Sequence, residues 1–428
     1  SAITSNAWLG KEYGFQFKKF LLDNFHIKYI VRSNAEHWFS NSKVSTIFSV
    51  LQFGQSNEST KFITINFKLE ETFDQENIAN QLRQIENFYE DIDNCNNPRN
   101  QGWQRDNNFQ NLFYKTDGSI SVSIVSKEQL LNSISEQENW AMYFFSAELF
   151  QIFDEHLMQL YPKTIDVIRG ERTGWNDMFV IPANEIEESK IEDDFLIPYV
   201  KSPTELTRLE FAGNYENYLF VCDLSLSQLR TDFPNAHRWI RRFQNATNRN
   251  GTKTIQEACS SHKPFWYSLK PKQASIVTAI NPYERFFFCY TQEPFTIDQR
   301  LVAITINEGG DVELIAALFN SIVTFLTIEM RGTSRHLGAL DLNANYFKTL
   351  RILNPDVLSA QDKRQIKTAF QPLKRRPIQT IFQELQQADR INFDKTVLQA
   401  FGIDETILPK LYQILSAAVY DRVTMSER

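Results

Sequence analysis

The sequence predicts an α+β protein built from several parts, and three observations support this expectation. An amphipathic helical pattern and alternating strand patterns share residues 1–71. Strand-like runs return between residues 145 and 355, where polar and basic stretches separate them. From residue 356 onward the periodicity is helical alone. A length of 428 residues, of which 42% are hydrophobic, suits two or three domains.

Composition and charge exclude several classes of protein. No apolar run approaches the roughly 20 residues that a membrane-spanning helix needs, and the start of the chain lacks the pattern of a signal peptide. Scattered cysteines without a CxxC pair indicate free thiols in a reducing compartment, so we expect a cytoplasmic protein without a zinc site. A net charge of −7 and a pI near 5.6 argue against a uniformly basic surface but allow a local basic patch.

The first 71 residues predict a small layered structure. Residues 11–24 fit an amphipathic helix with Phe17, Phe20 and Leu21 on its apolar face. Residues 26–32 carry apolar side chains on both faces, which is typical of a strand buried between helices. Residues 45–53 and 61–69 alternate and flank a turn-rich stretch, so we expect them to pair as a hairpin. This order is that of the closing part of an α/β sheet whose beginning is absent.

An aromatic pair, Trp38-Phe39, opens the polar stretch that precedes the strand at residues 45–53. On the residues alone, the simpler interpretation is a hydrophobic plug where the loop enters the sheet. The other interpretation is a platform on which the flat face of a ligand stacks.

The run SNAWLGKEYGFQFKKFLLDNFHIKYIVRSNAEHWFSNSKVSTIFSVLQF resembles the later motifs of amino-group DNA methyltransferases, the TaqI-like and type IIG restriction–modification adenine enzymes. In that family an aromatic residue at the loop head stacks on the adenine that is flipped out of the duplex. The resemblance implies this role for Phe39, which precedes Val44 at the family's spacing, and it leaves Trp38 in the core. A flipped base has lost its neighbours, and one replacement stack is worth about 1–3 kcal/mol.

Two motifs of that family are missing from the chain. Neither its Gly-rich cofactor loop nor its Asn-Pro-Pro-aromatic tetrapeptide is present, and Asn281-Pro282-Tyr283 lacks the second proline. The resemblance therefore implies a C-terminal piece with no catalytic, cofactor-binding or metal-binding residues of its own. S-adenosylmethionine is expected for the intact enzyme, and the missing N-terminal catalytic part is expected as a partner. The piece alone should not methylate DNA.

Residues 72–144 predict a connecting insertion. Residues 74–93 fit a polar helix, and an Asn-rich tract follows at residues 94–111 with little capacity to form a core. A surface loop is one interpretation of this tract, and a loop that clamps DNA through Arg99, Trp103 and Arg105 is the other. Residues 119–125 predict a strand, and Ser126 is placed to cap the helix after it.

A polar turn, Thr173-Gly174-Trp175-Asn176-Asp177, separates two apolar runs. It resembles the T-G-x-N turn that opens target-recognition domains in the same family. Functionally, such a turn presents Arg172, Thr173 and Asn176 to base edges or phosphates. Structurally, Gly174 provides a positive φ and Asn176 bonds its own backbone. The sequence leaves both interpretations open.

A local excess of positive charge lies between residues 225 and 285, where ten Lys and Arg accompany three acids. On a helix, Arg238, Arg241 and Arg242 have the i, i+3, i+4 spacing of one face. A solvated face is the ordinary interpretation. With Lys253 and the aromatic stretch 263–267 nearby, we expect these side chains to hold DNA phosphates.

An apolar helix is predicted at residues 311–330, and a Gly-flanked cationic loop follows it. Arg331, Arg335 and His336 in this loop are expected to contact a DNA groove. Alternatively, Arg331 and His336 complement the C-terminus of the helix, which Gly332 caps.

The remaining patterns say less about function. Asp177 with Glu188-Ser189-Lys190 has the spacing of a D…ExK metal site, but this run is charged and typical of solvated surface. Residues 356–428 predict helices, of which two are expected to pair through the apolar faces at residues 393–401 and 411–419. The cluster Lys374-Arg375-Arg376 is expected to be solvated, or to touch backbone phosphate.

Together these patterns predict four consecutive segments: residues 1–71 as a methyltransferase remnant, 72–144 as an insertion, 145–355 as a target-recognition domain and 356–428 as a helical pack. The expected function is to bind double-stranded DNA and recognise its target for an adenine-N6 restriction–modification methyltransferase. The alternative from another class is a protein-interaction scaffold that binds no nucleic acid.

Overall fold

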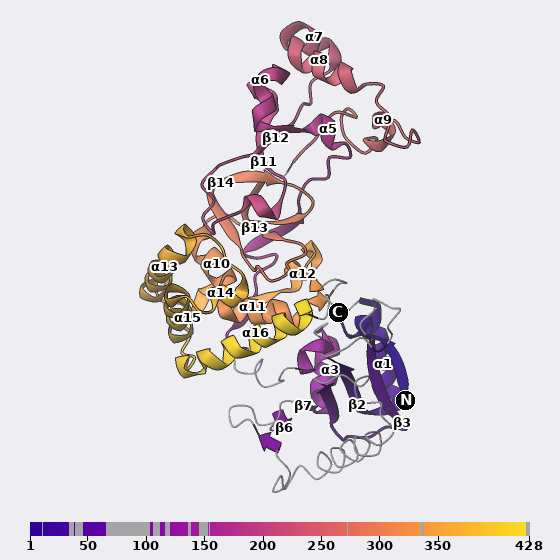
Figure 1. Cartoon of the computed structure of the whole chain (residues 1–428), viewed down its shortest axis with the longest axis vertical. Helices are drawn as coiled ribbons and strands as arrows, with labels where there is room; N and C mark the ends of the chain where they lie inside the picture. The colour runs from indigo at the N-terminus through magenta and orange to yellow at the C-terminus, as the bar shows by residue number, and fades with distance from the viewer. Residues whose placement is uncertain are drawn as a thin grey trace. The chain divides into compact units, whose positions relative to one another are not determined.

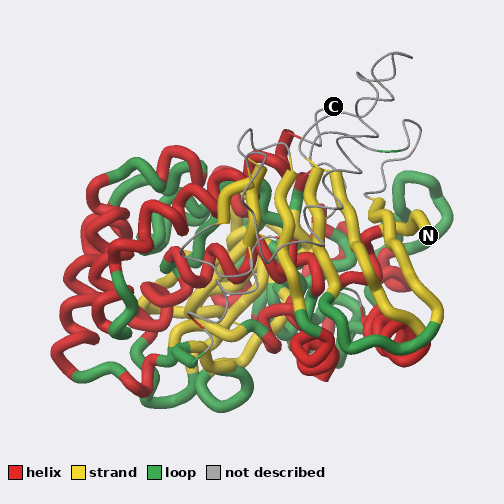
Figure 2. The backbone as a smooth tube through the Cα atoms, turned by 90° about the horizontal axis from the view of Figure 1, so that it is seen from below, coloured by secondary structure: helices red, strands yellow, loops and turns green. Residues whose placement is uncertain are grey.

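The chain folds into two compact units that are discontinuous in sequence. The computed structural model describes residues 1–10, 12–33, 38, 46–65, 103–105, 112–115, 120–135, 138–144, 153, 155–271, 273–334 and 338–424. The first unit comprises Ser1–Leu157, Ile322–Asp341 and Phe401–Arg428, and the second comprises Met158–Ser321 and Leu342–Ala400. Both units combine helices with mixed sheets, which confirms the predicted α+β class (Figure 2).

The first unit is built on a seven-stranded sheet in the order β1-β3-β2-β4-β7-β6-β5. Its strands are β1 (Ala2–Ser5), β2 (Phe25–Ser33), β3 (Thr46–Phe53), β4 (Thr60–Ile65), β5 (Trp103–Arg105), β6 (Leu112–Lys115) and β7 (Ile120–Val125). The expected hairpin of β3 with β4 is wrong, because β2 lies between them, antiparallel to β3 and parallel to β4. The apolar residues on both faces of β2 suit this interior position.

Seven of the described helices complete the first unit: η1 (Asn6–Leu9), α1 (Glu12–Asn24), α3 (Lys127–Ser135), η3 (Trp140–Phe144), α11 (Ile322–Arg331), η9 (Glu405–Ile407) and α16 (Leu408–Thr424). The ribbon β16 (Thr333–Ser334) with β17 (Leu340–Asp341) accompanies them. Ser126 caps α3 as predicted, since its Oγ accepts from the Gln129 N–H at 3.2 Å. Trp38 also packs as expected, against the core residues Val31, Ile63 and Val122.

The helix α1 turns a different face to the core from the one that its sequence predicts. Leu21 is buried as expected, but Phe17 and Phe20 are 38% and 53% exposed, and the buried polar residue is Lys18. Gly14 explains the rotation, because any Cβ there would lie against the backbone of Trp8. The face of α1 that contains Gly14 therefore approaches η1 most closely. Phe17 lies at the edge of this contact, with its ring 5.2 Å from that of Trp8, and Phe20 is more than half exposed.

The second unit is built on another seven-stranded sheet, in the order β10-β12-β11-β14-β13-β15-β9. Its strands are β9 (Ile165–Arg169), β10 (Val180–Pro182), β11 (Leu196–Val200), β12 (Asn217–Phe220), β13 (Gln273–Ala279), β14 (Cys289–Ile297) and β15 (Leu301–Ile306). A small ribbon joins β8 (Leu157–Gln159) to β18 (Arg351–Leu353).

Short helices surround the β10-β12-β11 end of this sheet and form with it what we call the lobe, residues 171–270. They are α5 (Asn176–Phe179), η4 (Ala183–Glu185), α6 (Ile186–Ser189), η5 (Asp193–Phe195), η6 (Pro203–Glu205), α7 (Leu226–Asp232), α8 (Pro234–Phe243) and α9 (Ile255–Ala258). Figure 1 shows α5 to α9 gathered beyond β11 and β12, away from α13. One hydrophobic cluster, from Met178 to Leu269, holds the lobe together.

Longer helices cover the rest of the second unit: α10 (Val312–Phe319), α12 (Ala344–Thr349), η8 (Pro355–Val357), α13 (Ala360–Arg375), α14 (Ile381–Glu384) and α15 (Ala388–Ala400). The single helix predicted at residues 311–330 is in fact two, α10 and α11, with a break at Asn320 and Ser321. The expected pairing of the two last long helices is also wrong. Instead, α15 packs on α13, and α16 packs on α11 within the first unit.

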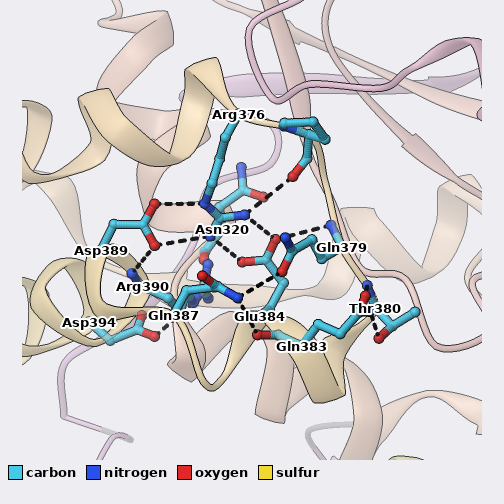
Figure 3. Close-up of polar contacts among 11 residues, drawn as sticks. Asn320, Arg376, Gln379, Thr380, Gln383, Glu384, Gln387, Asp389, Arg390 and Asp394 are labelled. Carbon is cyan, nitrogen blue, oxygen red and sulfur yellow. Dashed lines mark hydrogen bonds and ion pairs between the residues drawn. The ribbon is translucent and has the colours of Figure 1, made fainter.

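The predicted solvated cluster Lys374-Arg375-Arg376 is wrong for two of its three members. Lys374 is buried, and its Nζ lies 2.6 Å from a Glu313 oxygen and 3.2 Å from a Glu210 oxygen. Arg376 lies between two carboxylates, those of Glu384 at 2.7 Å and Asp389 at 2.6 Å (Figure 3). These cations therefore hold the second unit together, and only Arg375 of the cluster is exposed.

Within the described ranges, no single helix is both long and apolar enough to cross a membrane. The broken pair α10 and α11 reaches the required length and apolarity only when its two helices are counted together.

Candidate nucleic-acid interface

The Thr173–Asp177 turn belongs to the lobe, and the structure shows the local roles of Thr173, Gly174 and Asn176. Gly174 has a φ of 72°, so the structural interpretation of this glycine is confirmed. Thr173 is 4% exposed, and its hydroxyl donates to the Asn176 side-chain oxygen at 2.6 Å. Asn176 and Arg172 are exposed. Thr173 therefore positions Asn176 from inside, while Arg172 and Asn176 face solvent.

The helix α8 carries the predicted arginine face. Ala236 and Ile240 are buried, whereas Arg238, Arg241 and Arg242 are exposed. The start of the helix is capped from a distant part of the chain, because the carboxylate of Glu192 accepts the backbone N–H groups of residues 235 and 236 at 3.0 and 2.8 Å. An acid at the N-terminus and arginines in the last turn both suit the helix dipole.

Trp239 connects α8 to the turn. Its indole N–H donates to the backbone carbonyl of Met178 on α5, at 3.0 Å. On its other side the guanidinium of Arg242 lies 5.4 Å from the Trp239 ring, at a distance that suits a cation–π contact. The buried Cys259 completes the connection from α9, because its thiol donates to the carbonyl of Thr173 at 3.8 Å. Residues more than 60 positions apart thus form one surface element.

Lys253 lies in the tight loop between α8 and α9. The side-chain oxygen of Asn248 accepts from the backbone N–H groups of Thr252 and Lys253 at 2.8 and 3.2 Å, which fixes the loop. A capping box between Thr254 and Glu257 then starts α9. Lys253 is exposed on a loop whose backbone is well held.

The positive charge of residues 225–285 is mostly at the surface. Arg285 is half-buried and donates to the backbone carbonyls of Pro203 and Leu206, and Lys272 lies outside the described residues. Eight of the ten cations are exposed, and within the described part of the chain none of these eight forms an ion pair: Arg230, Arg238, Arg241, Arg242, Arg249, Lys253, Lys263 and Lys270. Cations that no carboxylate binds remain available to an external anion.

The other predicted site residues do not join this surface. Arg331 ends α11 in the first unit, where its guanidinium lies 2.8 Å from the Glu138 carboxylate and both side chains are 12% exposed. The last carbonyls of α11, those of Arg331 and Gly332, accept from the side chain of Asn139 at 3.1 Å. This arrangement serves the helix end. Phe39, Arg335 and His336 lie outside the described residues.

Sequence reasoning missed three residues that build the surface: Glu192, Cys259 and the acceptor Met178. Glu192 lay in an acidic run that looked like solvated surface, and a buried cysteine carries no signal about its partner. Among the described residues, no group of three or more His, Cys, Asp or Glu is placed to hold a metal ion.

Neither a protein-family model nor a curated protein matches the chain. A solved structure shares its fold. The chain is similar to the crystal structure of the type IIG restriction endonuclease BpuSI, with a TM-score of 0.52 and 14% sequence identity, over 100% of this chain and 48% of that chain. The chain thus spans about half the length of that structure. At this identity the likeness shows the fold alone.

Proposed function

We propose that the chain is the DNA-binding and target-recognition portion of an adenine-specific restriction–modification methyltransferase, and that the lobe holds the duplex. One observation carries the proposal: α8, whose arginines are exposed, is joined through the Trp239 indole to Met178, the residue that follows the Thr173–Asp177 turn. The fold likeness to a type IIG restriction endonuclease supports it. In this proposal the intact enzyme uses S-adenosylmethionine, which a catalytic part outside this chain binds.

Each residue of the surface takes a separate role in this proposal. Arg238, Arg241, Arg242 and Lys253 bind backbone phosphates, which gives affinity without sequence information. Asn176 reads a base edge, because its side-chain NH2 makes no hydrogen bond within the described residues and its oxygen is oriented by Thr173. An asparagine that offers both groups in a fixed plane is suited to adenine. Phe39 stacks on the flipped base.

Fluorescence anisotropy with a labelled duplex over a series of salt concentrations tests the phosphate contacts. Arg238→Gln/Arg241→Gln/Arg242→Gln should weaken binding, and it should flatten the plot of log affinity against log salt by about 0.9 for each phosphate that the variant no longer neutralises. Lys395→Gln is the matched control, since Lys395 is exposed on α15 outside the lobe. An equal weakening in both variants, or no binding by the unmodified chain, contradicts the proposal.

Selection from a random duplex library tests the base contact. The unmodified chain should enrich a consensus sequence, and Asn176→Ala should lose the preference at one position, which corresponds to about 1–3 kcal/mol of discrimination. Arg241→Gln should instead weaken binding to all sequences alike. An unchanged consensus with Asn176→Ala would remove Asn176 from the recognition of the bases.

A protein-interaction role is the second candidate, and the outer face of α1 favours it. Tyr13, Phe20 and Phe53 are 65%, 53% and 86% exposed. Phe20 and Phe53 both contact Phe25 edge to face, which makes a continuous aromatic surface of the kind that partner proteins cover. If interaction alone is the function, Phe20→Ser/Phe53→Ser should abolish concentration-dependent association in sedimentation velocity, and DNA binding should be absent throughout.

A further inference from the structure

The loop of residues 262–268 in the lobe is rigidly held, although it lies outside any helix or strand. The Nδ1 of His262 donates to the Trp266 carbonyl at 3.0 Å, and burial lowers the pKa of His262, which favours the neutral imidazole. Ser268, which is 1% exposed, bonds Phe265 twice: its Oγ accepts from the Phe265 N–H at 3.3 Å and its N–H donates to the Phe265 carbonyl at 2.9 Å. The loop is therefore shaped before any ligand arrives.

The aromatic side chains of the loop pack on a buried tyrosine, Tyr267. Tyr267 is 2% exposed, and its hydroxyl donates to the Leu224 carbonyl at 2.9 Å. The ring of Phe265 stacks on Tyr267 with centroids 5.1 Å apart and an angle of 15°, and Trp266 meets Tyr267 edge to face at 5.5 Å. Phe265 and Trp266 are only partly buried, so they form the solvent side of this group.

Trp266 differs from three tryptophans that serve packing, although the buried indole N–H of Trp38 also lacks an acceptor among the described residues. The indole N–H groups of Trp8, Trp140 and Trp239 donate to acceptors at 3.0, 2.7 and 3.0 Å. That of Trp266 has no acceptor among the described residues, and Trp175 in the recognition turn shares this property. A tryptophan that serves packing usually finds a partner for its N–H. An unpaired N–H on a partly exposed indole is what an external ligand would use.

The charge around the loop identifies the ligand. Lys263 and Lys270 flank the aromatic residues, both are exposed, and neither forms an ion pair within the described ranges. An aromatic face between cations matches a nucleotide strand, in which bases alternate with phosphates along the chain. Bases inside an intact duplex are already stacked, so only an unpaired base presents its face to such a site.

We propose that the 262–268 loop is a stacking site for an unpaired base of DNA, with Trp266 and Phe265 as its aromatic faces and Lys263 on the adjacent phosphate. This rests on the proposed function, because it adds a second kind of contact to the same DNA-binding lobe. Its consequence is that the lobe binds a duplex with one unpaired base more tightly than the intact duplex.

Competition anisotropy with an intact duplex, the same duplex with a central single-base bulge, and a dT oligonucleotide of equal length tests this proposal. The unmodified chain should prefer the bulged duplex, and Trp266→Ala should remove the preference, a loss of about fivefold to tenfold at the low end of one base stack. Affinity for the intact duplex should change less than twofold. Tight binding of the dT oligonucleotide would identify any unpaired strand as the ligand, and weak binding would restrict it to a base extruded from a duplex; both outcomes support the stacking site.

Three variants separate stacking from charge and from folding. Trp266→Phe keeps a ring and should keep the preference, while quenching of tryptophan emission by bulged DNA should fall. Lys263→Gln should weaken the binding of both duplexes alike, and it should flatten the slope of log affinity against log salt by about one unit. Tyr420→Ala, which removes a 55% exposed aromatic residue from the first unit, should change nothing.

The outcomes distinguish this proposal from the one on which it rests. Binding of both duplexes without preference, or a preference that survives in Trp266→Ala with Phe265→Ala, overturns the stacking site and leaves the phosphate surface intact. Failure to bind any of the three DNAs overturns both proposals.

Discussion

Lys18 is a buried lysine whose protonation should couple the stability of the first unit to pH. Its side chain is fully buried, and its Nζ donates to the Glu138 carbonyl at 2.9 Å and lies 4.4 Å from the Phe15 ring. Burial lowers the pKa of Lys18 from 10.5 to about 7, and the charge of Glu138 opposes this shift in part. Arg331 shares that carboxylate, so the charge of Glu138 is largely engaged elsewhere.

The sign of the effect follows from where the proton is held. Between about pH 7 and pH 10.5 the unfolded chain keeps the proton of Lys18 and the folded chain has released it. The unfolded state then binds more protons, so the free energy of unfolding rises with pH across this window. From pH 6 to pH 9 the contribution of Lys18 amounts to about 2–3 kcal/mol, at about 1.4 kcal/mol for each pKa unit.

Lys18→Met should remove this dependence, because methionine has a similar volume and no charge. Urea unfolding at pH 6 and pH 9, followed by circular dichroism, measures it. The variant should gain about 2–3 kcal/mol relative to the unmodified chain at pH 6 compared with pH 9. Lys19→Met, which replaces the exposed neighbour on α1, is the control. If the two variants respond to pH alike, the charge of Lys18 is not penalised by burial and the reasoning is refuted.

Three further substitutions have defined outcomes. Gly174→Ala should cost about 1–2 kcal/mol in urea unfolding, because φ is 72° and a Cβ would lie 3.2 Å from the Cys259 sulfur; an unchanged midpoint would contradict this. Asn320→Ala should cost about 2–5 kcal/mol by calorimetry, since the buried N–H and carbonyl of Phe288 are both left without their hydrogen-bond partner. Trp239→Phe should weaken duplex binding about threefold to tenfold with an unchanged salt slope, because it breaks a bond to α5 but removes no cation; a changed slope would argue against a positioning role.

The sequence predicted the individual helices and strands better than it predicted which of them pair. Strands and helices came from local periodicity, which the fold preserves, as at β7 and the Ser126 cap of α3. Pairing depends on what enters between two elements, and no local pattern announces that β2 separates β3 from β4. The apolar face of α1 failed for a similar reason, since the close contact at Gly14, and not the phenylalanines, sets its rotation.

For the candidate site, the sequence showed where the positive charges lie along the chain but not which of them form ion pairs in the fold. The arginines of α8 and those of residues 374–376 look alike as clusters. In the structure Arg241 is exposed, whereas Arg376 is held by two carboxylates from α14 and α15. That distinction depends on acids that are distant from Arg241 and close to Arg376 only after folding. The hydrogen bond from Trp239 to Met178, the residue after the Thr173–Asp177 turn, likewise joins distant parts of the chain and forms only on folding.

Because the first unit is discontinuous in sequence, it can be completed only after the second unit has been synthesised. Its sheet is synthesised first, but its last helix, α16, is synthesised at the end, after the whole second unit. At about 5–20 residues per second, the wait is on the order of tens of seconds. During it Glu329 on α11, which is 7% exposed in the finished fold, lacks the guanidinium of Arg422 that later binds both of its oxygens. A nascent chain that stops after Ala400 therefore contains every residue of the second unit but lacks the last helix of the first.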